Sequence, residues 1–315
     1  MTGGRRLREH VVAFIRTHTL WQPGERVAIA VSGGRDSVVL LDVLASTRGL
    51  HGGELSVVTV DHGTRAGSAD DAAFVEQRAE SYGVPCTVHT VALGVGASED
   101  MCRDVRLKAF SSLDVDAVAT GHHARDHAET LLIRLLRGTG PRGLGGLRPK
   151  REHQVRPLLD VPFDDVVRYA NDAKLDFRED PTNASPAFLR NRVRHELLPL
   201  LESLRPGSVA SVARTARLAS EESEWLDALV GDVTDVWSCA FLGHAPMPAV
   251  RRAVLKDEPS LRHVHVDAIR ALARRGVGHI QLPNGRLAIA DSGHVRTCTG
   301  LLTFPSIGTG GACDT

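Results

Sequence analysis

The sequence predicts an α/β fold, with a Rossmann-like parallel sheet followed by a smaller C-terminal α+β domain. Its first half alternates short apolar, β-branched runs with helical patterns, which is typical of βαβ units with right-handed crossovers. Polar and glycine residues follow several of these runs, where ligands bind in parallel sheets. The last part carries short strand patterns separated by Pro, Asn, Ser and Gly turns.

The first twenty residues alternate apolar and charged positions, which predicts an amphipathic helix and not a signal peptide. The predicted strands of the first domain are Val27–Val31, Leu55–Val60, Thr87–Leu93 and Ala117–Thr120. The helices that follow them are Asp36–Ser46, Ala69–Tyr82, Glu99–Ser112 and Asp126–Arg137. A helix over Phe163–Leu175 and a basic helix over Phe188–Leu201 complete this domain.

Arg205-Pro-Gly-Ser predicts a domain boundary, because Pro and Gly together interrupt regular structure. The expected domains are therefore residues 1–205 and 206–315. The second is predicted to be helical to about Leu255. A helix over Leu261–Arg274 and strands over His279–Leu282, Arg286–Asp291 and His294–Cys298 follow, and the tail from Pro305 is expected to fray.

Composition excludes several classes of protein. No apolar run approaches the roughly 18 residues that a membrane span needs. The five cysteines form no CxxC pair, so a disulfide framework or a zinc site is not expected, and a reducing cytoplasm is. Lys plus Arg equals Asp plus Glu, at 38 each, so nucleic-acid binding must depend on local clusters. Aromatic residues total 4 %, which excludes widespread base stacking.

The strongest motif is the segment that follows the first predicted strand. Ser32-Gly33-Gly34-Arg35-Asp36-Ser37 places two glycines and two hydroxyls where a strand turns into a helix. Glycines let the backbone approach an anion, and the helix N-terminus offers unpaired N–H groups. Asp36 repels phosphate, so its expected role is to hold Mg²⁺. The alternative is a turn in which Asp36 or Ser37 caps the helix.

This segment resembles the SGGxDS loop of the PP-loop ATP pyrophosphatases, whose domain is adenine nucleotide alpha hydrolase-like. The resemblance implies that residues 32–37 grip ATP, and that ATP is split into AMP and pyrophosphate. The loop by itself indicates only anion binding.

Three further segments resemble the tRNA(Ile)-lysidine synthase family. They are Val60-Asp-His-Gly-Thr-Arg65, Thr120-Gly-His-His-Ala-Arg-Asp-His-Ala-Glu-Thr130, and Asp180-Pro-Thr-Asn183 with Arg190-Asn-Arg-Val-Arg-His-Glu196. The likeness covers about Arg26 to Leu201 and extends weakly to Gly276–Pro283. It implies a catalytic ATP-binding domain over 1–205 and a tRNA-binding accessory domain over 206–315. The implied partners are a CAU-anticodon tRNA(Ile) and free L-lysine.

By resemblance, Asp126 and Glu129 meet the lysine amine or a magnesium ion. They stand three residues apart on one face of a first helical turn, so a capping box is an equally good interpretation. Gly121, His122 and His123 end the fourth strand beside the expected ATP crevice, where one histidine contacts the adenylate and the other could be a core residue. Asp61 and His62 end the second strand, near the base or ribose, or form a strand-terminating turn.

The basic residues of the helix at 188–201 predict phosphate contacts with tRNA, and a solvated charged face is the alternative. The expected RNA-binding residues are Arg103, Arg106, Arg137, Arg190, Arg192 and Arg194. Further basic residues extend this patch: Arg134, Arg142, Arg148, Lys150 and Arg151.

Within Arg125–Thr130 the chain departs from the family at two positions, where Arg125 replaces an acid and His127 replaces Gln, and Leu107 stands where the family has an aromatic residue. These changes put the metal shell and the tRNA contacts in doubt, but not the ATP loop. The rival interpretations are another PP-loop enzyme, such as a tRNA thiolase, and a non-catalytic nucleotide- or RNA-binding homologue. We expect no membrane partner. A homodimer stays open, because the sequence does not give the oligomeric state.

Overall fold

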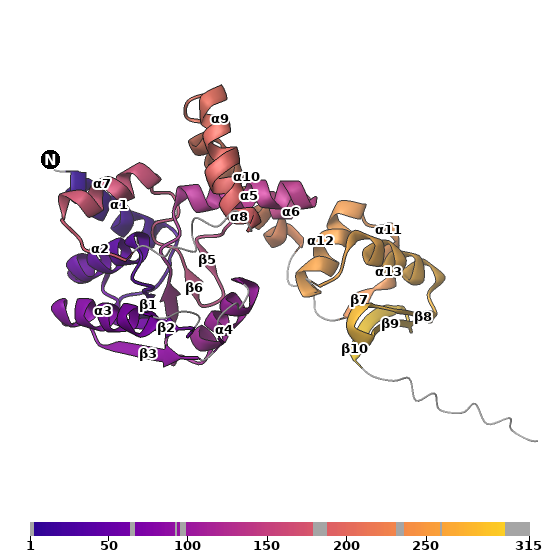
Figure 1. The fold of residues 1–315 in the computed structure, drawn as a ribbon. Coiled ribbons are helices and arrows are strands. Elements are labelled where there is room, and N and C mark those ends of the chain that lie inside the picture. The colour runs from indigo at the N-terminus through magenta and orange to yellow at the C-terminus, as the bar shows by residue number, and fades with distance from the viewer. Residues whose placement is uncertain are drawn as a thin grey trace, which may run out of the picture. The chain divides into compact units, whose positions relative to one another are not determined.

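The computed structural model describes residues 3–63, 67–91, 93–94, 99–178, 188–230, 236–258 and 260–299. The chain divides into two compact units, residues 1–221 and 222–315, within one long helix (Figure 1). The boundary that was expected at Arg205 lies earlier in the chain than this division, at the end of the helix over Leu198–Leu204. The assignment of separate roles to 1–205 and 206–315 therefore stays a prediction.

The first unit contains a six-stranded sheet surrounded by helices. Its strands are β1 (Arg26–Ala30), β2 (Glu54–Asp61), β3 (Cys86–Thr90), β4 (Ala117–Ala119), β5 (Lys150–Arg151) and β6 (Gln154–Val155). Its helices are α1 (Gly3–Thr17), α2 (Arg35–His51), α3 (Ser68–Ser81), α4 (Glu99–Ser111), α5 (Ala124–Arg137), α6 (Pro141–Leu144), α7 (Phe163–Asp172), α8 (Leu189–Arg192), the π-helical turn η2 (Val193–Leu197) and α9 (Leu198–Leu204). Helix α10 (Ser208–Val230) leads into the second unit.

The strand order is β3-β2-β1-β4-β6-β5, and every pair except β5–β6 is parallel. The predicted parallel α/β fold is therefore confirmed. The chain proceeds outward from β1 to β3 and then returns to the other side of β1 with β4. This reversal lies between β1 and β4, which is the position where open α/β sheets bind ligands.

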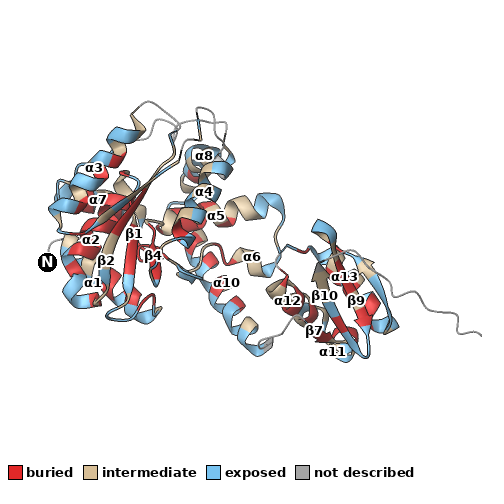
Figure 2. Ribbon diagram, turned by 90° about the horizontal axis from the view of Figure 1, so that it is seen from below, coloured by how far each residue is buried: buried red, intermediate tan, exposed pale blue. Residues whose placement is uncertain are grey.

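Successive side chains of a strand point to opposite faces of the sheet, and β4 and most of β1 are coloured as buried (Figure 2). Val27 and Ile29 of β1 pack with side chains of α1, α2, α3 and α7 in the larger core. Ala28, between them, packs on the other face with Phe110 of α4. Burial on both faces explains why these strands read as continuous apolar runs and not as alternating patterns.

The structure differs from the predicted elements in three places. The β5–β6 hairpin was not predicted, because two-residue strands carry no readable period. Strand β3 ends at Thr90, since its ladder with β2 stops at the Asp61–Thr90 pair. The predicted helix over Phe188–Leu201 is divided into α8, η2 and α9, with a π-helical turn in the middle.

The second unit is the predicted smaller α+β module. Its elements are β7 (Val236–Ser238), α11 (Cys239–His244), α12 (Met247–Asp257), α13 (His263–Arg275), β8 (Gly278–Gln281), the 3₁₀ turn η3 (Pro283–Gly285), β9 (Arg286–Asp291) and β10 (His294–Thr299). The antiparallel order is β7-β10-β9-β8. The prediction of helix throughout to Leu255 is wrong at β7, where Trp237 is drawn into the core of this sheet and its indole donates to Asp257.

The described helices contain no segment that is both long enough and apolar enough to cross a bilayer.

A close backbone approach at Gly121 leads to a first prediction. A Cβ there would lie 2.9 Å from the carbonyl oxygen of Asp36 and 3.1 Å from the nitrogen of Ser37. Because these are backbone atoms, they cannot move without displacing the start of α2. We expect Gly121→Ala to lower the free energy of unfolding by about 1–3 kcal/mol in urea titrations.

Gly49→Ala is the matched control, because Gly49 lies in the same helix and a Cβ there meets no atom within 4 Å. We expect this change to raise stability by about 0.5–1 kcal/mol. Equal effects of the two substitutions would contradict the close approach.

Candidate active site

The loop after β1 is closed by its own hydrogen bonds. Gly33 has φ of 83°, in the left-handed region that glycine tolerates. The Ser37 hydroxyl donates to the carbonyl of Gly34 at 2.7 Å and accepts from the backbone N–H of Ser32 at 3.1 Å. Arg178 donates its backbone N–H to the carbonyl of Gly33 at 2.9 Å. The loop is thus held in a shape that leaves the N-terminus of α2 available for an anion.

The two serine hydroxyls are not equivalent in this loop. Ser37 is buried and uses its proton inside the loop, whereas the Ser32 hydroxyl lies 3.3 Å from that of Ser37. The expected phosphate contacts of Ser32 and Ser37 stay predictions. The structure adds that Ser37 also fixes the conformation of the loop.

His123 lies between the carboxylates that the sequence singled out. Its Nε2 is 3.5 Å from Oδ2 of Asp36 and 3.4 Å from Oδ2 of Asp126. Burial lowers the pKa of His123, but the charges of Asp126, Asp36 and Glu129 outweigh burial and raise it overall. His123 therefore favours the cationic form and links the start of α2 to the start of α5.

Asp126 is the third residue of α5 and caps the helix from there, with His123 as the N-cap residue. The predicted capping box began at Asp126 and used Glu129, so the observed one lies three residues earlier in the chain. Oδ2 of Asp126 accepts the backbone N–H of His123 at 3.0 Å. Burial by itself raises the pKa of Asp126. The positive charges of His123, Arg190 and Arg194 together have a larger, opposite effect, so the pKa is lowered overall and the carboxylate is ionised. Capping leaves the other carboxylate oxygen of Asp126 directed to Arg190 and Arg194.

Glu129 is completely buried and is surrounded by arginines. Arg194 approaches it in a bidentate manner, with Nε at 2.6 Å from Oε1 and Nη2 at 2.9 Å from Oε2. The Nε of Arg190 donates to Oε2 at 3.0 Å, and the Nε of Arg125 lies 3.7 Å from Oε1. Arg190 and Arg194 stand four residues apart and so share a face across α8 and η2.

This pairing changes how two groups of predicted residues relate. Asp126 and Glu129 were expected to bind lysine, and Arg190 and Arg194 to bind RNA. In the structure each group neutralises the other, so the lysine role and the RNA role both stay predictions. Arg192 faces solvent and pairs with Glu196 at 3.2 Å.

Arg35 and Arg125 stack on one aromatic ring. Each guanidinium carbon lies 4.9 Å from the centroid of Phe163, at the start of α7, and the ring of His123 is 5.2 Å from it. Phe163 therefore holds Arg125, one of the residues that differ from the family pattern, beside Arg35 of the phosphate loop. No sequence pattern pointed to Phe163, because a single aromatic residue at the start of a helix is ordinarily a core residue.

The other strand ends carry the remaining predicted ligands. Asp61 accepts the backbone N–H of Gly63 at 2.9 Å, which forms a turn at the end of β2. Burial, with the charge of Arg106, lowers the pKa of the neighbouring His62. Burial likewise lowers the pKa of His122 to about 3, and its Nδ1 lies 2.8 Å from the Thr120 hydroxyl. His122 is therefore neutral, in contrast to His123.

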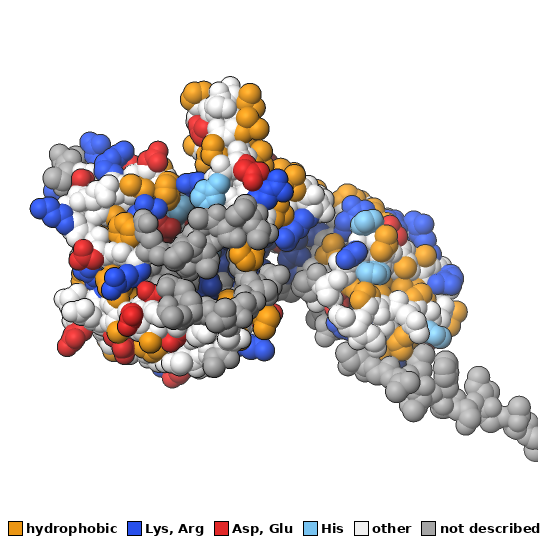
Figure 3. Space-filling view, viewed as in Figure 1, with side chains coloured by type: hydrophobic (Ala, Val, Ile, Leu, Met, Phe, Trp, Pro, Cys, Tyr) orange, Lys and Arg blue, Asp and Glu red, His pale blue; other side chains and the backbone are white. Residues whose placement is uncertain are grey.

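The remaining expected RNA-binding residues lie on exposed helix surfaces. Arg103 and Arg106 are exposed on α4, and Arg137 is exposed at the end of α5. The second unit also presents many basic side chains (Figure 3). Between residues 236 and 299 it carries nine Lys and Arg against four Asp and Glu, which is a local excess that the neutral whole chain conceals.

Two segments of the family-like motifs lie outside the described residues: Asp180-Pro-Thr-Asn183, and Thr64-Arg65 at the end of the Val60–Arg65 motif.

Asp36 has the chemistry that a magnesium ion requires. Its Oδ1 is buried and accepts no hydrogen bond from the described residues, although the Nε of Arg35 lies 3.6 Å away. Among the described residues no group of three or more His, Cys, Asp or Glu side chains could hold a metal. A single carboxylate fits Mg²⁺ that is bound mainly by phosphates and water.

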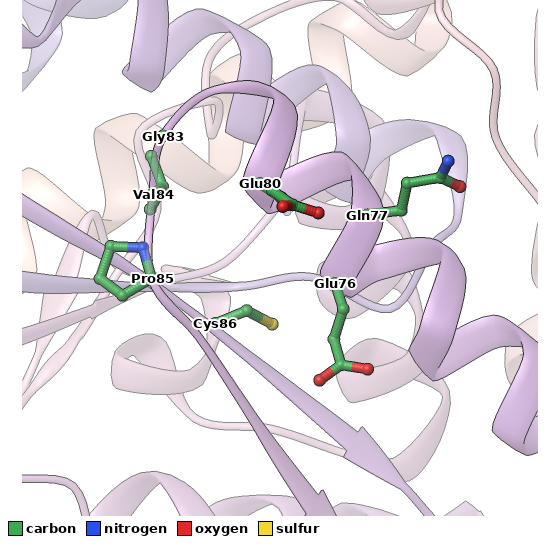
Figure 4. A pocket seen from close by; sticks show the side chains of 7 residues that line it. All are labelled: Glu76, Gln77, Glu80, Gly83, Val84, Pro85 and Cys86. Carbon is green, nitrogen blue, oxygen red and sulfur yellow. The ribbon is translucent and has the colours of Figure 1, made fainter.

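A surface pocket lies away from this chemistry. It is lined by Glu76, Gln77, Glu80 and residues 83–86, at the end of α3 and the start of β3 (Figure 4). This is the amino end of β3, whereas ligands in parallel sheets bind at carboxyl ends. Burial and Glu76 raise the pKa of the Cys86 thiol to about 11, so it is unreactive at neutral pH.

The parallel sheet, its reversal between β1 and β4, and the phosphate loop at that point define a PP-loop domain. The family model described as the PP-loop domain matches residues 6–201. A solved U34-tRNA thiolase, NcsA from Methanococcus maripaludis, has the same fold, with a TM-score of 0.55 at 21 % identity over 69 % of this chain and 80 % of that one.

Curated relatives define the group more narrowly. A tRNA(Ile)-lysidine synthase of Solibacter usitatus is 39 % identical over 91 % of this chain and 63 % of its own length. Those of Geobacter sulfurreducens and Salinispora tropica are 35 % and 36 % identical, and this chain covers 70 % and 89 % of their lengths. The chain belongs to the tRNA(Ile)-lysidine synthase family. It spans less than two thirds of the Solibacter relative.

His127, the second departure, has a structural role that leads to a prediction. It is buried, and its Nε2 lies 3.1 Å from the carbonyl oxygen of Gly145, to which the neutral ring can donate. Burial lowers the pKa of His127 below its ordinary 6.5. The unfolded chain then binds more protons below pH 6.5, so stability is lost as the pH falls from 6.5 toward the folded-state pKa.

We expect His127→Gln, which restores the residue usual in the family, to flatten this part of the pH profile, since an amide can also donate to Gly145. The free energy of unfolding, measured by urea titration between about pH 5 and about pH 8, tests this. For one such group the slope approaches about 1.4 kcal/mol per pH unit. An unchanged slope would show that His127 does not titrate with unfolding.

Proposed function

We propose that this chain is an ATP-dependent ligase that converts the wobble cytidine of a CAU-anticodon tRNA(Ile) into lysidine. The observation that carries the proposal is the line of groups from the loop at 32–37 through Asp36 and His123 to Asp126 and Glu129. It joins a site for ATP to a pair of carboxylates at one edge of the sheet. Membership of the lysidine synthase family supports this assignment over other PP-loop reactions.

In the first step the cytidine C2 oxygen attacks the α-phosphorus of ATP and pyrophosphate leaves. The loop and the N-terminus of α2 hold the phosphates, while the cationic His123 lies where negative charge develops. Asp36 would hold Mg²⁺, which supplies charge neutralisation on the phosphates when bound. Gly121 permits the close approach that places His122 and His123 beside this loop.

In the second step the neutral ε-amine of lysine attacks C2 and AMP leaves. We propose that the lysine ammonium first binds at Asp126 and Glu129 in exchange for a guanidinium. Such an exchange replaces one cation by another, so neither carboxylate is left buried without a counter-ion. The amine must then lose a proton to become a nucleophile, and a carboxylate is a suitable acceptor.

The tRNA would contact basic residues of both units, including Arg103, Arg106, Arg137 and Arg192. The basic excess in residues 236–299 supports an accessory role for the second unit. Because the proposed substrate is a tRNA, we propose that the reaction takes place in the cytoplasm.

The decisive assay measures AMP and pyrophosphate release from ATP with unmodified CAU-anticodon tRNA, across a panel of free amino acids. We expect turnover that requires both the tRNA and lysine. Turnover with another amino acid would overturn the proposed nucleophile but keep the adenylation chemistry. Absence of turnover with any amino acid would favour a binding protein.

Asp36→Asn keeps the size of the side chain and removes its charge. We expect AMP release to fall by about 10²-fold or more, because the metal loses its protein ligand. Thermal unfolding should be unchanged, and Asp267→Asn, an exposed position on α13, should retain full activity. Full activity of Asp36→Asn would refute the metal role.

A further inference from the structure

Arg156 lies at the ligand-binding edge of the sheet, although no motif pointed to it. It directly follows β6, which is parallel to β4 with Val155 opposite Ala119. The carboxyl ends of β1, β4 and β6 therefore meet at the same edge. Arg156 thus follows the carboxyl end of β6, just as His122 follows that of β4 and the phosphate loop follows that of β1.

The guanidinium of Arg156 is buried and has no carboxylate partner in the part of the chain that the structure describes. The residue is 5 % exposed. Its Nη1 donates to the carbonyl of Arg148 at 2.8 Å and its Nη2 to Oε1 of Gln154 at 3.1 Å, while its Nε has no acceptor. Among the residues that the structure describes, no carboxylate pairs with it. A buried cation in this condition is costly unless an anion joins it.

Three other arginines act electrostatically on Arg156. Burial and, to a smaller extent, the charges of Arg151, Arg103 and Arg134 together lower the pKa of Arg156 to about 10, so it stays protonated at neutral pH. Arg134 donates to the carbonyls of Gly143 and Gly146, at 2.9 and 2.7 Å, and to no carboxylate in the described part of the chain. Cations that repel one another in this way would be stabilised by a bound anion.

We propose that Arg156, with Arg103 and Arg134, forms a second phosphate-binding site that takes a phosphodiester of the RNA substrate. The planar guanidinium fork suits a phosphate group, which can accept from both Nε and Nη atoms. That the phosphate belongs to RNA depends on the proposed function. That an anion binds here depends only on the uncompensated charge.

The site is distinct from the loop at residues 32–37. Adjacent strands lie about 4.8 Å apart, so β6 is about 10 Å from β1, with β4 between them. A single phosphate group cannot contact both places. Arg103 lies on α4, whose exposed arginines were already expected to bind RNA.

The test measures binding of an unmodified CAU anticodon stem-loop RNA, by fluorescence anisotropy over a series of KCl concentrations, without ATP or lysine. We expect Arg156→Gln to weaken binding about tenfold and to reduce the slope of log affinity against log salt by about 0.7–0.9. Arg156→Lys keeps the charge but not the planar guanidinium, so its RNA affinity should lie between those of the wild type and of Arg156→Gln. Arg103→Gln should weaken binding several-fold, with an ATP dissociation constant unchanged in all three variants.

Arg5→Gln is the matched control, because Arg5 is an exposed arginine on α1 that pairs with Glu9. It should leave the salt slope unchanged. Unchanged RNA affinity in Arg156→Gln would overturn the site. A raised dissociation constant for ATP with unchanged RNA binding would assign the phosphate to the nucleotide and overturn the RNA contact.

Arg156 also holds the carbonyl of Arg148, so circular dichroism must show that each variant is folded. If Arg156→Gln does not fold, Arg156→Lys and Arg103→Gln decide the question, and unchanged RNA affinity in both would overturn the site. Because the binding assay omits lysine, its result is separate from the lysine dependence of AMP release. An enzyme that uses another amino acid would refute the proposed function and leave this site standing.

Discussion

The end of β4 touches the start of α2 backbone against backbone, and the chemistry of the first unit depends on this contact. Gly121 allows it, because any Cβ there would enter the space of the Asp36 peptide. The contact brings two segments from distant parts of the sequence to one place. One carries the phosphate loop, and the other carries His123 and the first turn of α5. Asp36 and His123 then meet across it at 3.5 Å.

Charge balance explains why the acidic and basic motifs meet in the same core. Asp126 and Glu129 are buried, which would be strongly unfavourable for isolated carboxylates. Arg190 and Arg194 pair with them, and Phe163 carries Arg125 beside them on its ring face. Arg156 is the exception to this balance, since the described residues around it supply oxygen acceptors but no carboxylate partner.

His127 and Arg125, which both differ from the family pattern, have different roles in the structure. His127 is a buried donor to Gly145 and holds the glycine-rich loop that follows α6, where a Gln could do the same. Arg125 is part of the site, because it stacks on Phe163, approaches Glu129 and donates to the carbonyl of Arg194 at 2.9 Å. An acid in its place would face the same carboxylate, whereas Arg125 places a cation beside Glu129.

Local patterns in the sequence determined the parallel sheet and the family, and they singled out the loop at 32–37 and the acids in the first turns of α5. Each depends on residues that are close in sequence, such as the glycines of 32–37 or the apolar runs of β1 and β2. Tertiary structure alone decided that Arg190 and Arg194 pair with Asp126 and Glu129, that β7 replaces part of a helix, and that Arg156 is buried at the ligand edge. These outcomes depend on which distant side chains become neighbours when water is excluded, and no short-range pattern records that.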